Sequence, residues 1–246
     1  MSMMRNNRWS MVWVGLAVLV IASCSGSKVT TKASAELPRY QVRTIALVPL
    51  TTLTTPQARD LSSPVFPAPE GARRSDMAIA MPPNTEQPIR QTVKVPIDAG
   101  AKVTQLLWSH LRTRQGVTVL APSEAVKALV SEAPPQSPIG QSPAMTVAHQ
   151  LKADASLIGQ VLVYQERVGG RFGANPPATV GFEVKVVASD GQVLWVGNYY
   201  ERQRPMIEDM MGFVQRWGMF VTAEELATYG VEHLLLEFPF GTVEEP

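Results

Sequence analysis

The clearest pattern along the chain is an alternation of apolar and polar positions between Thr179 and Ala188. A two-residue period predicts a strand with one buried face. The dipeptide Asp190-Gly191 follows it and favours a two-residue hairpin turn. Pairing outward from this turn places six residues on one predicted core face, in three opposite pairs: Val186 with Trp195, Val184 with Gly197, and Phe182 with Tyr199. A slip of one residue would turn that face to solvent, so the pattern determines the register.

Helical periods and short apolar runs predict the elements around this hairpin. An apolar stripe with three- and four-residue spacing predicts a helix that begins at Asp98 as N-cap, runs to about Gln115 and stops at Gly116. Thr222 and Glu225 have the spacing of a capping box, which opens a final helix reaching about Leu236. The remaining expected elements are strands at 44–48, 117–120 and 155–166 and helices at 124–132, 144–152 and within 206–220.

This order of elements predicts a single α/β domain over residues 41–240. Its mixed sheet should carry an antiparallel C-terminal meander and be flanked by helices. Residues 51–97 are rich in proline and poor in large apolar residues, which predicts a Pro-rich disordered insertion. Residues 24–40 are rich in Ser, Thr and Lys without an apolar period, which predicts a flexible tether, and 241–246 are expected to form a tail.

The first 23 residues have the three-part pattern of an export signal peptide. A polar segment with two arginines precedes the apolar run 11–22, and small residues follow. That run would span about 18 Å as a helix against a hydrocarbon core of roughly 30 Å, which is too short for a comfortable membrane span. Ile21-Ala22-Ser23-Cys24 resembles the bacterial lipobox, in which the chain is cleaved between Ser23 and Cys24 and the cysteine is lipidated. An ordinary secretory signal and an uncleaved short anchor are the alternatives.

A lipid on Cys24 would hold the mature chain on a membrane without spanning it. In lipoproteins of enterobacterial type, Asp after the cysteine favours inner-membrane retention, so Ser25 favours the periplasmic side of the outer membrane, with the inner membrane as the alternative. Removing the signal takes away two of the 22 basic residues and none of the 21 acidic ones, which leaves a net charge near −1. No basic footprint for nucleic acid is therefore expected.

The element order, together with the segments 153–160 and 189–195, resembles a group of envelope lipoproteins with an anticodon-binding-domain-like α/β fold. This group includes the curli secretion channel subunit, the LpoB-type activators of peptidoglycan synthases and the N-terminal domain of TolB. The resemblance covers roughly residues 42–200, and its motifs are structural. It implies a periplasmic binding or assembly module in secretion, envelope assembly or regulation of peptidoglycan synthases, with an envelope protein as its partner. A subunit of an oligomeric secretion or surface-organelle complex, and an envelope hydrolase, are the alternatives.

The residues that most often carry chemistry favour a non-enzymatic protein without cofactor or metal. No two of His110, His149 and His233 lie within one helical turn, so packed structural roles are expected. Cys24 is the only cysteine, and a lipid on it leaves no free thiol. The glycine-rich segment 169–173 opens no helix and lacks the Gly-Lys-Ser/Thr of a phosphate loop, so it is interpreted as a hairpin tip.

Three residues at the exit of the last predicted strand are candidates for a partner surface. Tyr200, Arg202 and Arg204 follow the expected core positions Trp195 and Tyr199. Aromatic and arginine side chains are enriched at the energetic centres of protein interfaces. The sequence therefore predicts that a partner binds near this strand end, and a homo-oligomer is the alternative.

Overall fold

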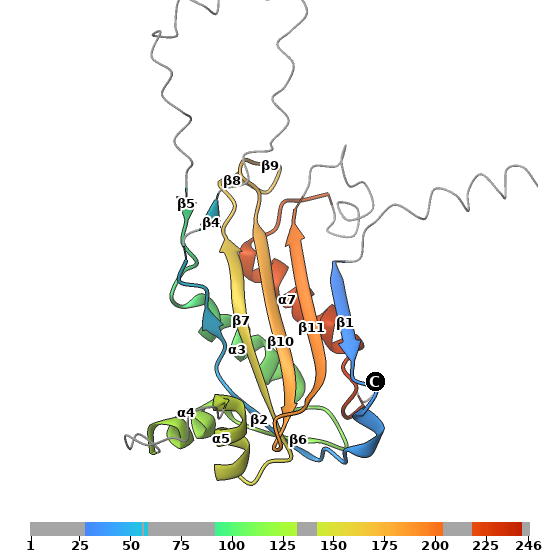
Figure 1. The fold of residues 1–246 in the computed structure, drawn as a ribbon. Coiled ribbons are helices and arrows are strands. Elements are labelled where there is room, and N and C mark those ends of the chain that lie inside the picture. The colour runs from blue at the N-terminus through green and yellow to red at the C-terminus, as the bar shows by residue number, and fades with distance from the viewer. Residues whose placement is uncertain (1–27, 56, 59–91, 132–141, 204–217, 243–246) are drawn as a thin grey trace, which may run out of the picture.

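The computed structural model describes residues 28–55, 57–58, 92–131, 142–203 and 218–242. Within them a seven-stranded sheet has the order β1-β11-β10-β7-β2-β6, and β3 pairs with β7 beside this path (Figure 1). Its strands are β1 (Val29–Ala33), β2 (Thr44–Leu47), β3 (Thr51–Thr52), β6 (Thr118–Leu120), β7 (Ala155–Gln165), β10 (Thr179–Ala188) and β11 (Val193–Arg202). Two short pairs lie apart from it: β4 (Gln57–Ala58) with β5 (Thr92–Val93), and β8 (Gly169–Gly170) with β9 (Gly173–Ala174).

The sheet is mixed, as the element order predicts. β1, β11, β10 and β7 are antiparallel neighbours, whereas β2 runs parallel to both β7 and β6. The predicted hairpin register is confirmed, because Val186 faces Trp195, Val184 faces Gly197 and Phe182 faces Tyr199. The chain therefore folds as an α/β domain with an antiparallel C-terminal meander.

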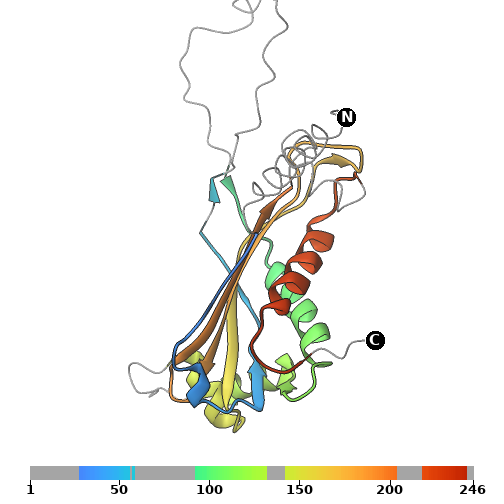
Figure 2. The same ribbon diagram turned by 90° about the vertical axis from the view of Figure 1, so that its right-hand side faces the viewer.

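Helices cover the two faces of the sheet unequally (Figures 1 and 2). α3 (Ala99–Leu111) and α7 (Ala223–Leu236) lie side by side over one face, and the main hydrophobic core lies between them and the strands. α4 (Pro122–Ser131) and α5 (Pro143–Gln150) pack on the opposite face at the β2 end, over a smaller cluster around Ala46 and Val147. A sheet with this unequal cover has one buried face and one partly open face.

The predicted tether is wrong where the chain is described. Residues Val29–Ala33 form β1, which pairs with β11 over five positions, and Leu37–Arg39 form a 3-10 helix. An edge strand needs backbone partners more than apolar side chains, so a segment of β-branched Val and Thr can pair without a strong hydrophobic signal. Composition alone therefore could not distinguish this strand from a linker.

The expected insertion and tail are also shorter than predicted. Thr51–Thr52 pairs with β7, and Val95 lies in the core, so the start and end of 51–97 belong to the fold. Most of that range, 59–91, lies outside the described residues. At the other end, Gln115 and Thr242 exchange two backbone hydrogen bonds of 2.9 Å, so the chain remains paired beyond residue 240.

The helix ends agree with the predicted signals in part. Thr222 and Glu225 form both hydrogen bonds of the capping box, and α7 ends at Leu236 as expected. Asp98 makes no capping bond because its backbone is already helical, and its carboxylate pairs instead with Lys102 at 2.8 Å. α3 also ends at Leu111 and not near Gln115, although Gly116 has the left-handed φ of +82° expected after a stop.

The remaining expected helices and strands are present within about two residues of their predicted bounds. The helix expected within 206–220 lies mainly outside the described residues, as does the whole signal segment 1–23. In the part of the chain that the structure describes, no helix has the length and apolar character needed to cross a membrane.

Candidate interaction surface

The strands β1, β11 and β10 turn a row of polar side chains away from α3 and α7. The alternation that buries Val184 and Tyr199 points their neighbours to the opposite face. We call these outward residues the open face: Thr30, Lys32, Glu183, Lys185, Val196, Asn198, Tyr200 and Arg202. Each of them is partly or fully exposed. The sheet itself therefore forms a surface of the described molecule here.

The strand register arranges this surface in two cross-strand rows. Thr30, Asn198 and Glu183 lie opposite one another across three strands, and so do Lys32, Val196 and Lys185. The ammonium group of Lys185 lies 2.5 Å from the carboxylate of Glu183 on the same strand. Neighbouring side chains in such rows are about 5 Å apart, so these residues form a continuous and mainly polar surface.

Tyr200 is the large aromatic residue of the open face and is 55% exposed. A Cβ atom at Gly181, its cross-strand neighbour, would lie 2.9 Å from Cδ2 of the Tyr200 ring. The absence of a side chain at Gly181 therefore lets the ring lie against β10. The backbone N–H of Tyr200 donates to the carbonyl of Lys28 at 3.0 Å, which joins the ring position to the start of the described chain.

The covered face beneath this strand end holds a buried polar network. The hydroxyl of Tyr199 donates to the carboxylate of Glu201 at 2.8 Å, and the carbonyl of Leu226 in α7, at 3.2 Å, is a second acceptor that shares the same proton. Lys28 pairs with the same buried carboxylate of Glu201 at 2.9 Å. These contacts connect β11 with α7 and with Lys28, the residue before β1. They stabilise the position of the β11 backbone next to Tyr200.

The predicted partner residues divide into described and undescribed positions. Tyr200 is exposed and Arg202 is half-buried on the same face of β11, so the structure brings these two together. Arg204, Ser23 and Cys24 lie outside the described residues. Thr30 and Lys32 were missed because their segment was interpreted as a tether. The run Val29-Thr30-Thr31, with three β-branched residues, is the signal that could have found them.

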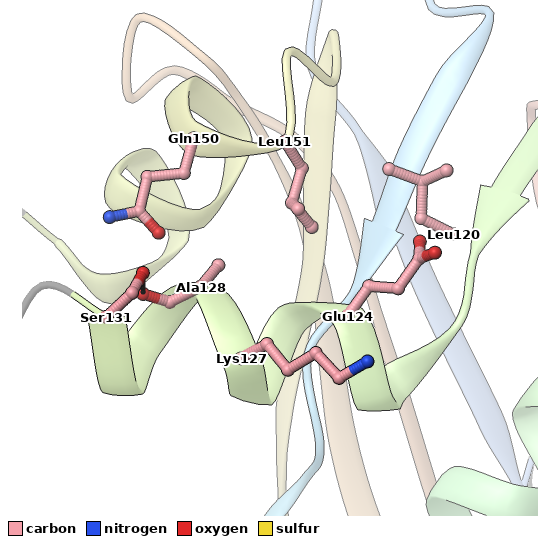
Figure 3. Close-up of a pocket in the computed structure, with 7 residues that line it drawn as sticks. All are labelled: Leu120, Glu124, Lys127, Ala128, Ser131, Gln150 and Leu151. Carbon is pink, nitrogen blue, oxygen red and sulfur yellow. Dashed lines mark hydrogen bonds between the residues drawn. The ribbon is translucent and has the colours of Figure 1, made fainter.

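A shallow groove of about 720 Å³ lies between α4 and α5 (Figure 3). Glu124 and Lys127 line it from α4, and Gln150 enters it from α5 with its side-chain oxygen buried and without a hydrogen-bond partner. The hydroxyl of Ser131 donates to the carbonyl of Ala128 at 3.1 Å, so it faces no general base. Neither histidine nor cysteine is among its lining residues: Leu120, Glu124, Lys127, Ala128, Ser131, Gln150 and Leu151.

The histidines agree with the expected packed roles only in part, whereas the glycine-rich segment agrees with its interpretation. The ring of His233 packs against Tyr229 with centroids 4.0 Å apart, whereas His149 is exposed on α5. Across the described ranges, no three His, Cys, Asp or Glu side chains gather where they could hold a metal ion. The segment 169–173 forms the β8–β9 hairpin, which confirms the predicted tip.

No protein family and no curated protein sequence matches the chain. Several solved structures resemble it, including the following three. The PelC dodecamer from Paraburkholderia phytofirmans is 14% identical, covers 84% of this chain and 93% of its own, and has a TM-score of 0.43. Lipoprotein GNA1162 from Neisseria meningitidis is 13% identical over 71% of this chain and 94% of its own, at a TM-score of 0.34. The LpoB C-terminal domain from Salmonella enterica is 11% identical over 67% of this chain and 85% of its own, at 0.33.

Likeness at these identities and TM-scores assigns neither a family nor a function to the chain. The neighbours include an LpoB domain, one of the proteins that the sequence resembles. The resemblance to the curli channel subunit and to TolB stays a prediction.

Proposed function

We propose that this chain is a lipid-anchored envelope lipoprotein that binds an envelope protein, without catalysis, on the open face of its sheet. The observation that carries this proposal is the exposed sheet surface around Tyr200, over which no described helix packs. A large sheet exposes one face to water when that face is polar, but Tyr200 adds an aromatic ring that is more than half exposed.

The composition of the open face suits a protein partner. Tyr200 and Arg202 are of the residue types that most often dominate interface energetics, and the surrounding Asn198 and Thr30 supply hydrogen-bonding groups. The ring lies over Gly181 of β10, and the backbone that carries it is paired with Lys28, so the fold presents the ring from a hydrogen-bonded strand. An aromatic centre with a polar rim is the arrangement of a binding surface.

The proposed anchor is a lipid on Cys24, and the proposed address is the periplasmic side of the outer membrane. Its support is the lipobox-like sequence directly after the apolar run. Mass spectrometry of the membrane-extracted chain should show a mature N-terminus at Cys24 carrying acyl chains. The Cys24→Ala variant should then be released from the membrane, and equal membrane association of both forms would contradict the anchor.

Site-specific photo-crosslinking tests the binding surface. A photoreactive amino acid is placed at Tyr200 in the full chain in its own cells, and at Leu236 as the control. Leu236 is 77% exposed on α7, on the other side of the molecule. We expect one discrete conjugate with an envelope protein from position 200 and little conjugate of any kind from position 236.

The other outcomes separate the alternatives. A conjugate between two copies of the chain from position 200 would favour the subunit of an oligomeric complex over the binding module. Equal, diffuse labelling from both positions would contradict a binding role for the open face.

A further inference from the structure

The chain is bonded to the sheet from Lys28 onward, only a few residues after Cys24, whereas a flexible tether was predicted for residues 24–40. Lys28 is already held to the sheet through the bond from Tyr200 and the ion pair with Glu201. Three residues separate Cys24 from Lys28, so their Cα atoms are at most about 14 Å apart. A lipid on Cys24 would therefore hold this end of the sheet next to the bilayer surface.

The strand register shows which other segment shares that end. Arg202 of β11 lies opposite Thr179 of β10, which in turn lies opposite Gln165 of β7. Neighbouring strands are about 4.8 Å apart, so β1 and β7 are separated by roughly 14 Å across the sheet. β7 runs farther toward this end, because Val29 is level with Val161 through Tyr199 and Phe182, whereas β7 continues to Gln165. The β8–β9 hairpin connects β7 to β10 and extends beyond this end in both views (Figures 1 and 2).

The hairpin exposes apolar side chains beside a cation. Phe172 is 89% exposed, Val168 is 59% exposed, and the side chain of Arg171 is also 59% exposed. Transfer of an exposed phenylalanine ring out of water is favourable, and phenylalanine is among the residues that membrane-surface segments insert at the boundary between headgroups and acyl chains. The guanidinium of Arg171 pairs with Glu225 at 3.8 Å, and its positive charge also has the sign that anionic headgroups attract.

The base of the hairpin is attached to the start of the covering helix α7. The backbone N–H of Phe220 donates to the carbonyl of Arg171 at 2.7 Å. The side chain of Glu166 accepts from the N–H of Ala223, the first residue of α7, at 3.1 Å. The tip is therefore presented by the fold at a defined position.

We propose that the tip formed by Val168, Arg171 and Phe172 contacts the phospholipid surface, with Phe172 entering the boundary between headgroups and acyl chains. This inference rests on the proposed lipid on Cys24. The short link to Cys24 argues for a bilayer as the occupant. The lipid anchor keeps the bilayer surface near the tip, so the second contact is intramolecular. A weak contact through one aromatic residue is then enough. The contact would fix the orientation of the domain and leave the α4 end farthest from the membrane.

A single introduced cysteine can report on this contact, since a lipid on Cys24 leaves no other thiol. The variants are Phe172→Cys and the matched control Val130→Cys, which replaces another exposed apolar residue, 70% exposed on α4. Each mature lipidated chain carries an environment-sensitive fluorophore in vesicles of phosphatidylethanolamine and phosphatidylglycerol. The expected result at position 172 is a blue-shifted emission, quenching by spin-labelled phospholipid, and severalfold weaker quenching by iodide than at position 130.

Two results would overturn the inference. One is equal behaviour of the two positions in both quenching experiments. The other is protection of position 172 from iodide without quenching by spin-labelled lipid, which would indicate a protein contact at the tip. A failed anchor is recognised separately, because an unlipidated Cys24 would lack acyl mass and would take up a second fluorophore.

Discussion

Tyr199 and Tyr200 are adjacent in the chain and differ in almost every structural respect. The Tyr199 ring is 1% exposed, contacts Phe182 at a centroid distance of 5.4 Å and bonds through its hydroxyl to α7. The Tyr200 ring is 55% exposed and lies on the open face. The difference arises from the two-residue period of a strand, which assigns neighbouring side chains to opposite faces. One strand can thus supply a core residue for stability and a surface residue for binding.

Truncating the two tyrosines should give the largest contrast. Tyr199→Ala removes a buried ring from the main core and should lower the free energy of unfolding by about 4 kcal/mol. Tyr200→Ala should change it by less than about 1 kcal/mol, because the ring is largely exposed. Urea denaturation followed by circular dichroism measures both. Similar losses from both variants would mean that Tyr200 is packed as tightly as Tyr199, which would contradict the exposed position of its ring.

A methyl group at Gly230 tests how closely α7 packs on the covered face. A Cβ atom there would lie 2.3 Å from Cε1 of the Tyr199 ring. Gly230→Ala should therefore destabilise the protein by about 1–2 kcal/mol, although alanine favours helix by roughly 1 kcal/mol.

Gly170 supplies the control for that substitution. A Cβ atom at Gly170 in the exposed hairpin meets nothing within 4 Å, so Gly170→Ala should stay within about 0.5 kcal/mol of the parent in the same denaturation experiment. A stabilised Gly230→Ala variant would show that α7 can move away from the sheet.

The capping box that begins α7 should contribute less. Thr222→Ala removes the bond to the N–H of Glu225 and should cost about 1 kcal/mol. The pKa of Glu225 is lowered, mainly because its carboxylate accepts from the backbone N–H of Thr222. Because the pKa of Glu225 is lower in the folded state, its charged carboxylate stabilises the fold. This stabilisation is complete above the ordinary pKa of Glu and is lost as the pH falls through the folded-state pKa.

The pH dependence separates the carboxylate from the hydroxyl. The difference in thermal midpoint between the parent and Glu225→Gln should be present at neutral pH and shrink below about pH 4. A difference that is independent of pH down to acidic conditions would rule out the charged capping bond.

The open face should give the smallest effect. Lys185→Ser breaks the ion pair with Glu183, but both side chains are partly exposed and screened by solvent. The expected loss is below about 0.5 kcal/mol and should vanish in high salt. A loss of several kcal/mol, measured by the same urea titration, would mean that a part of the chain covers this face.

The sequence by itself determined the C-terminal hairpin, its register and the buried face that contains Phe182 and Tyr199. Strict alternation and an Asp-Gly turn are local signals, and a shift of one residue would expose the entire core face. The same local information identified Tyr200 as a surface residue and Thr222 as a helix cap. Each of these features depends on residues that are near one another in the chain.

Only the tertiary structure decided three features: the position of β1, the placing of β1 and the β8–β9 hairpin at one end of the sheet, and the exposure of the open face among the described residues. β1 is a strand because β11 offers it backbone partners more than 160 residues away, as in the pair Val29 and Tyr199. Asp98 likewise does not cap its helix, because its backbone is already helical. Its carboxylate forms an ion pair with Lys102 instead. Backbone pairing and helix placement are long-range properties, so composition and periodicity carry little information about them.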